Sequence, residues 1–312
     1  MTDDRAGGGL RYQTLPNAPA GEADVVIAPV PLEMTVCGHG GTAAAPAAIL
    51  AATAELEFFD EFERWSPMKH LTVHVADPIV PTARETLEAF HARLADAAAA
   101  TTTRGLFVAL GGEHAVTPSL CRGRMAGDAT VVFFDAHADL RATYQGTAHS
   151  HACAAYQLHE AGHRVIIIGA RSFYESELDL IAASPRLELF TDDAVCADGG
   201  MAAVLERLAA IDGDVWISID MDVFDPAVAP GVGTPQPGGL DWRRMRDLTT
   251  AVTRAHAPRL RGVDIVELVP DPTGVTPITA AKLLQTVISV WGKAMGYETR
   301  PETGAQSRIA YE

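Results

Sequence analysis

The chain has 312 residues, of which 48% are hydrophobic and 21% are charged, proportions typical of a globular protein with a substantial core. Its net charge of −16 argues against nucleic acid or an anionic membrane as a partner, because both would repel it. The sequence has neither the ~20 consecutive apolar residues of a membrane helix nor the apolar segment of a signal peptide. The four cysteines form no Cys-x-x-Cys pair, which is typical of a reducing compartment. We therefore expect a cytoplasmic protein without a disulfide framework.

Eight short apolar runs rich in β-branched residues predict eight strands. They span residues 23–30, 70–76, 105–110, 129–134, 164–168, 187–190, 214–219 and 260–265. Good helix formers between the runs predict helices over residues 43–56, 84–100, 202–210, 242–256 and 278–295. Strands that alternate with helices indicate an α/β fold with a parallel sheet, although an eight-fold β/α barrel fits the same pattern. Residues 1–23 are expected to form a flexible tail and residues 24–312 a single domain, because no change of composition marks a boundary.

Four of the runs end in acidic or imidazole side chains. These side chains are Glu113 and His114 after the third run, Asp135, His137 and Asp139 after the fourth, Asp220 and Asp222 after the seventh, and Glu267 after the eighth. The alternation at 135, 137 and 139 sends three side chains to the same side wherever the backbone stays extended. Both open α/β sheets and β/α barrels place their active sites at the carboxyl ends of the strands. We therefore expect these side chains to meet in one active site.

Two imidazoles and four carboxylates of this set are candidate metal ligands. They are His114, Asp135, His137, Asp139, Asp220 and Asp222. A single aspartate after a strand is more often a helix cap, but capping does not explain two alternating acidic clusters. A ligand set without thiolates suits Mn²⁺ better than structural zinc. Six ligands are too many for one catalytic ion and suit two ions roughly 3.5–4 Å apart, which share carboxylates and convert a bridging water to hydroxide.

Four blocks of the sequence resemble the ureohydrolase family, which includes arginase and agmatinase. They are Gly-Gly-Glu-His at 111–114, Asp-Ala-His-Ala-Asp at 135–139, the stretch 218–240 that begins Ser-Ile-Asp-Met-Asp-Val-Phe-Asp-Pro, and Asp-Ile-Val-Glu-Leu-Val-Pro at 264–270. The blocks occur in family order over most of the chain. Further stretches within 29–60 and 139–153 are most similar to agmatinase.

The resemblance implies two Mn²⁺ ions per subunit and assigns each ligand to them. One ion is expected on His114, Asp135, Asp139 and Asp220, and the other on His137, Asp135, Asp220 and Asp222. Asp135 and Asp220 would therefore bridge the ions. The implied fold is a three-layer α/β/α sandwich on a mostly parallel eight-stranded sheet, as in arginase, assembled as a trimer or hexamer.

The resemblance also implies three catalytic roles. Asp139 would orient the bridging hydroxide, and Glu267 would pair with the guanidinium of the substrate. His151 would bind near the substrate and transfer a proton to the leaving amine, because a histidine titrates near neutral pH. His149, two residues earlier, is the alternative proton donor. Cys153 is expected to pack in the core, and Arg141 to anchor its loop.

The expected reaction is hydrolysis of a small guanidino substrate to urea and a primary amine, most simply of agmatine to putrescine in polyamine biosynthesis. The alternatives are the same chemistry on 4-guanidinobutanoate, arginine or a specialised metabolite, and a metal-binding relative that has lost catalysis. Two departures from the family pattern bear on this expectation. Ala115 stands where the family usually has serine, so a hydrogen bond behind the metal ligands could be lost. The loop 34–41 also diverges, which puts the identity of the substrate in doubt.

Overall fold

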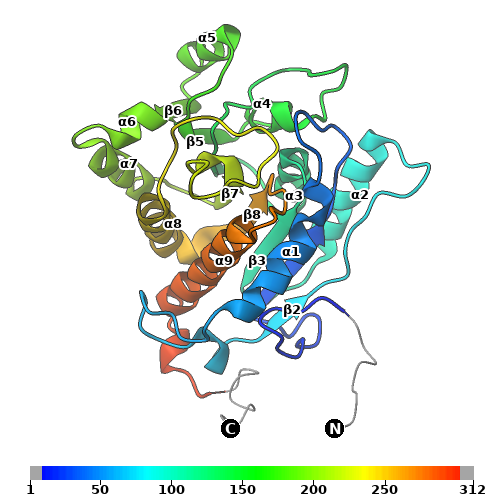
Figure 1. Cartoon of the computed structure of the whole chain (residues 1–312), viewed down its shortest axis with the longest axis vertical. Helices are drawn as coiled ribbons and strands as arrows, with labels where there is room; N and C mark the ends of the chain where they lie inside the picture. Colours follow the sequence, from blue (N-terminus) through cyan, green and yellow to red (C-terminus); the bar gives the residue numbers. More distant parts are fainter. Residues whose placement is uncertain (1–8, 303–312) are drawn as a thin grey trace.

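The computed structural model describes residues 9–302, and its framework is one eight-stranded sheet (Figure 1). All eight predicted strands are confirmed, with ends that differ by a few residues. They are β1 Val25–Val30, β2 Val73–Val75, β3 Leu106–Gly111, β4 Thr130–Phe134, β5 Arg164–Ala170, β6 Leu187–Thr191, β7 Val215–Asp220 and β8 Leu260–Val266. Every neighbouring pair is parallel, in the order β2-β1-β3-β8-β7-β4-β5-β6.

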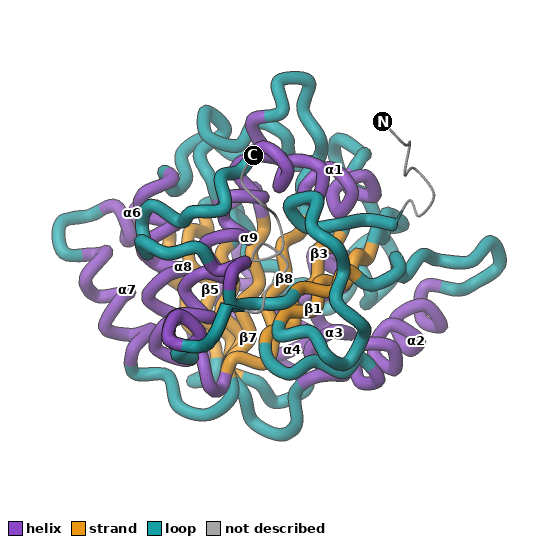
Figure 2. Tube along the Cα trace, turned by 90° about the horizontal axis from the view of Figure 1, so that it is seen from below, coloured by secondary structure: helices purple, strands orange, loops and turns teal. Residues whose placement is uncertain are grey.

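The central strands consist mostly of buried apolar residues because both faces of the sheet are covered. In β4, all five residues are buried. Val132 and Phe134 pack into the hydrophobic cluster on one face, whereas Val131 and Phe133 pack into the cluster on the other. Figure 2 shows the strands in the middle of the molecule with helices on both sides, which is the predicted three-layer α/β/α sandwich.

The helices divide between the two faces according to the cluster that their apolar residues join. One face carries α1 Ala45–Ala52, α6 Asp192–Cys196, α7 Gly200–Ala209, α8 Trp242–His256 and α9 Val275–Ala294. The other carries α2 Leu87–Ala100, α3 Thr117–Arg124, α4 Ala154–Glu160 and α5 Glu175–Ala183. The five predicted helices correspond to α1, α2, α7, α8 and α9, whereas helices α3 to α6 were not predicted. No helix within residues 9–302 is both long enough and apolar enough to cross a membrane.

The order of the strands explains where the polar residues meet. The sheet is open, with β2 and β6 at its edges, so the barrel alternative is excluded. The four strands that release acidic or imidazole groups are β3, β8, β7 and β4, and these are consecutive in the middle of the sheet. Their carboxyl ends therefore lie side by side. Ligands of open α/β sheets bind at this edge.

The segment before β1 differs from the expected flexible tail. Residues 1–8 of that prediction lie outside the described residues. Tyr12 and Leu15, by contrast, are buried and belong to the same hydrophobic cluster as α1 and α9. The Gln13 N–H also donates to the Thr53 hydroxyl, at 2.8 Å. Tyr12 and Leu15 thus pack this segment against the helical layer on one face of the sheet.

Candidate active site

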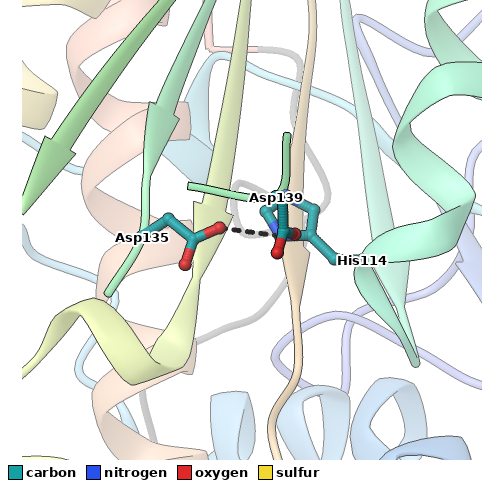
Figure 3. A group of neighbouring side chains, drawn as sticks. All are labelled: His114, Asp135 and Asp139. Carbon is teal, nitrogen blue, oxygen red and sulfur yellow. Dashed lines mark ion pairs between the residues drawn. The ribbon is translucent and has the colours of Figure 1, made fainter. Parts of the chain in front are cut away.

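His114 lies at the centre of three carboxylates. It begins a 3-10 turn directly after β3, and its Nδ1 lies 3.1 Å from Asp135 Oδ2, 3.2 Å from Asp139 Oδ2 and 3.3 Å from Asp220 Oδ2. In Figure 3 the Asp135 carboxylate and the His114 ring point toward each other, with Asp139 beside the ring. Three carboxylates from the ends of β4 and β7 thus converge on one imidazole nitrogen that follows β3.

A second group forms around His137. Its Nδ1 lies 3.0 Å from Asp222 Oδ2 and 3.6 Å from Asp135 Oδ1. Asp135 therefore belongs to both groups and turns one oxygen toward each histidine. The structure thus brings together all six residues that the sequence suggested as metal ligands.

Backbone hydrogen bonds hold the carboxylates in this arrangement. Asp220 Oδ1 accepts from the Asp222 N–H at 2.8 Å, and Asp222 Oδ1 accepts from the Ala136 N–H at 3.1 Å. In both residues the other oxygen faces an imidazole. Asp139 has a positive φ of 50°, a conformation that costs free energy in a residue other than glycine. In this conformation the Asp139 carboxylate faces His114.

The chemistry of the cluster fits divalent cations. Asp135, Asp220 and Asp222 are each at most 3% exposed, and burial with neighbouring carboxylates raises the pKa of Asp220 well above its usual value. Burial and then Asp135 raise the pKa of Asp139 to about 6. His114 Nδ1 and Asp135 Oδ2 are within ion-pair distance, yet neither makes a hydrogen bond within residues 9–302. Buried charge and lone pairs without hydrogen bonds are stabilised when a cation lies between them.

The far nitrogen of His114 also has a partner, which the sequence analysis missed. His114 Nε2 lies 2.8 Å from Ser218 Oγ, and Ser218 donates to Asp264 Oδ1 at 2.6 Å. The Trp216 Nε1–H donates to the other Asp264 oxygen at 2.5 Å. The ring of His114 is therefore held from β7, by the hydroxyl of Ser218. Ser218 and Asp264 were quoted within motifs, but their spacing did not indicate contact with His114.

Glu267 lies beside the cluster at the end of β8. It has a positive φ of 61°, and its Oε1 accepts from the His114 N–H at 2.6 Å. No residue in the described range 9–302 donates a hydrogen bond to its other oxygen. Burial, opposed in part by this backbone bond, raises the pKa of Glu267 to about 8. The free oxygen is therefore available to a cationic ligand.

His151 and His149 are only two residues apart but have different surroundings. His151 begins the 3-10 turn His151–Cys153 and lines the cavity above the cluster. Burial, followed by the nearby imidazoles of the cluster, lowers the pKa of His151 to about 4. His149 instead stacks on His91, with ring centres 4.9 Å apart, and is not among the side chains that line the cavity. The placement of His149 disfavours it as the alternative proton donor.

The cavity has a volume of about 340 Å³ and extends from the cluster to the aromatic side chains of Tyr144, Phe173 and Tyr174. The Arg141 guanidinium lies 4.8 Å from the ring centre of Tyr144 and 5.3 Å from that of Tyr174. Arg141 thus packs between two rings, consistent with an anchoring role. Cys37 joins the same wall, with its Sγ 3.2 Å from the Tyr144 hydroxyl.

Several known proteins are similar to this chain in sequence and in fold. The profile of the arginase family matches residues 23–289. N(1)-aminopropylagmatine ureohydrolase of Thermus thermophilus is 35% identical over 287 residues, which cover 91% of this chain and 96% of that protein. Agmatinase of Pyrococcus horikoshii is 31% identical over 278 residues, which cover 88% and 95%. The crystal structure of agmatine ureohydrolase of Thermoplasma volcanium matches with a TM-score of 0.77 and 28% identity, over 90% of this chain and 93% of that one.

Proposed function

We propose that this chain uses two Mn²⁺ ions to hydrolyse a guanidino substrate to urea and a primary amine. The chain belongs to the arginase family, and the proposal starts from that membership. The relatives described above are named ureohydrolases or agmatinases, so the chain is a hydrolase of guanidino compounds. The identity of the metal and of the substrate is the part that we propose.

The observation that supports this proposal best is the position of Asp135 between two histidine-carboxylate groups. One ion would be held by His114, Asp135, Asp139 and Asp220, and the other by His137, Asp135, Asp220 and Asp222. The donors are imidazole nitrogens and carboxylate oxygens, which suit Mn²⁺. When bound, two such ions lower the pKa of water and supply hydroxide at neutral pH. Asp139 would orient that nucleophile.

Glu267 would bind the guanidinium of the substrate. Its free oxygen can accept one guanidinium N–H, and its Oε1 retains a lone pair for a second, parallel hydrogen bond. A cationic substrate group beside this buried carboxyl would lower its pKa and keep it ionised. The pair would hold the planar guanidinium in one orientation while its central carbon is attacked.

His151 would supply the proton that the leaving amine needs. A guanidinium C–N bond breaks easily only if the departing nitrogen is protonated as it leaves. His151 lines the cavity, and its lowered pKa means that it can give up a proton readily once it carries one. Proton transfer from His151 to the amine would thus complete the reaction.

The first candidate substrate is agmatine, which would yield putrescine and urea for polyamine biosynthesis. N(1)-aminopropylagmatine is a second candidate, because the relative from Thermus thermophilus is named for it and is 35% identical. Phe173 and Tyr174 line the cavity together with residues of the cluster, so the cavity offers aromatic contacts to a longer tail. We also propose a cytoplasmic location and a homo-oligomer, either a trimer or a hexamer, as the family resemblance implies.

Urea release by the Mn²⁺-loaded protein tests the proposal. The substrates to compare are agmatine, N(1)-aminopropylagmatine, 4-guanidinobutanoate, arginine, guanidinoacetate and guanidine. We expect urea from agmatine or its aminopropyl derivative, and none from the Glu267→Gln variant with either. Urea from another compound alone would retain the chemistry and overturn the substrate. No urea from any compound, with two ions bound, would contradict the proposed activity.

A further inference from the structure

Hydrogen bonds join the buried side chains of Glu113 and Thr35 to the half-buried His151, and none of the three is a proposed metal ligand. The Thr35 N–H donates to Glu113 Oε1 at 2.7 Å and to Oε2 at 3.0 Å, and the Thr35 hydroxyl contacts the same Oε2. Thr35 Oγ1 also lies 3.3 Å from His151 Nδ1 and 3.3 Å from the His151 backbone nitrogen. Thr35 thus links a buried carboxylate to the proposed proton donor.

The number of hydrogen bonds that the Thr35 hydroxyl can donate and accept decides which atom donates in each of these contacts. A hydroxyl has one proton to donate and two lone pairs that accept. The Thr35 N–H donates to both oxygens of Glu113, and the Thr35 hydroxyl donates its proton to Oε2. The two remaining lone pairs face the backbone N–H and the ring Nδ1 of His151. Nδ1 must therefore carry a hydrogen if this contact is to be a hydrogen bond.

We infer that Thr35, fixed by Glu113, is a positioning residue that holds the proton of neutral His151 on Nδ1 and leaves Nε2 as the nitrogen that exchanges protons in the cavity. The inference rests on the proposed function of His151. The protons balance as follows: Nε2 takes up the proton that the attacking water gives up, passes it to the leaving amine, and returns to its unprotonated state. The Nδ1 proton stays on the hydrogen bond to Thr35 throughout. When the tautomer is fixed in this way, no molecules carry the ring proton on Nε2, where it would prevent Nε2 from accepting a proton.

One neighbour could impose the opposite tautomer. Ser150 Oγ lies 3.4 Å from His151 Nδ1, and a serine hydroxyl that donated to this nitrogen would place the ring proton on Nε2. This contact is longer than that from Thr35, and Ser150 has no carboxylate partner among the described residues that would direct its proton. Ser150 therefore provides a matched control within the same ring environment.

The test must separate positioning from a structural role of Thr35 in its loop. Thr35→Val removes only the hydroxyl, because the backbone N–H at this position can still donate to Glu113. Thr35→Ser keeps the hydroxyl, and Ser150→Ala removes the competing one. We expect Thr35→Val to lower kcat roughly 10–100-fold with little change in KM, since a histidine held in the wrong tautomer is a poor proton donor. Thr35→Ser should restore most of kcat, and Ser150→Ala should resemble the wild type.

The tautomer itself is measured by ¹⁵N NMR of the histidine ring nitrogens in the full-length protein. Diamagnetic Zn²⁺ replaces Mn²⁺ in this experiment, and His151→Asn identifies the resonances of His151. We expect protonated Nδ1 in the wild type, Thr35→Ser and Ser150→Ala, and a mixture of tautomers in Thr35→Val. Protonated Nε2 in the wild type, or a tautomer that changes in Ser150→Ala and not in Thr35→Val, would overturn the inference. A protein without urea release but with this NMR pattern would contradict the proposed function and leave the Thr35 contact established.

Discussion

Removing the hydroxyl of Ser218 should weaken one proposed metal site and spare the other. Ser218 donates its proton to Asp264 at 2.6 Å, so its oxygen accepts the Nε2–H of His114 at 2.8 Å. This bond fixes the His114 tautomer in which the Nδ1 lone pair faces the carboxylates. In Ser218→Ala the Nε2–H would be buried without this acceptor, and the ring would be free to turn or to exchange its proton between the two nitrogens.

The expected size of the effect follows from the role of this bond. Loss of an outer hydrogen bond to a ligating histidine typically costs ~10–100-fold in metal affinity, or about 1.4–2.7 kcal/mol. Asp264 would keep its bonds from Trp216, at 2.5 Å, and from Thr117, at 3.1 Å, so the substitution should not release a free buried charge. The His137 group has no contact with Ser218, so the second ion should bind with unchanged affinity.

Calorimetric titration of the metal-free protein with Mn²⁺ measures the affinity of each of the two ions. Ser289→Ala is a matched control, because Ser289 is also buried and accepts the indole N–H of Trp65 at 2.7 Å, away from the cluster. Both variants should lose some thermal stability, but only Ser218→Ala should bind one ion more weakly. Unchanged binding of both ions by Ser218→Ala, or equal weakening of both, would refute the role assigned to this bond.

Three further variants test the site and its surroundings. Asp135→Asn should abolish tight binding of both ions, measured as metal content after dialysis, and retention of one ion would show that Asp135 does not bridge. Glu267→Gln should keep both ions and lose urea release, because a neutral amide cannot pair with a guanidinium; retained turnover would exclude the assigned role. Burial lowers the pKa of His91 to about 4, below its usual 6.5, so its contribution to stability is complete above pH 6.5 and is lost as the pH falls. Between pH 7 and pH 5 the wild type should lose about 2 kcal/mol more in denaturant unfolding than His91→Gln, and equal losses would contradict this.

The sheet was predictable because its strands are buried on both faces and therefore appear as continuous apolar runs. The long helices α8 and α9 were predicted for a similar reason, as extended segments of good helix formers. Helices α3 to α6 have between 5 and 9 residues, too few for a periodic pattern to stand out. The buried Tyr12 and Leu15 were missed because two apolar residues in a polar segment give no period at all.

The metal ligands were predictable because they alternate immediately after strands, so local geometry brings them together. The residues that support them were not, because their contacts join distant parts of the chain. Thr35 and Glu113 are separated by 78 residues, and His114 and Ser218 by 104. His149 and His151 are the same residue type two positions apart, and they differ in their contacts with distant residues, His91 for His149 and Thr35 for His151.

Anomalous X-ray diffraction from crystals soaked in Mn²⁺ tests the central claim most directly, because it locates each ion against the side chains. We expect two peaks, roughly 3.5–4 Å apart. One should lie within ligand distance of His114 Nδ1 and the other of His137 Nδ1, with the carboxylate of Asp135 between them. A single peak, or two peaks that do not share Asp135, would contradict a binuclear centre at the carboxyl ends of these strands.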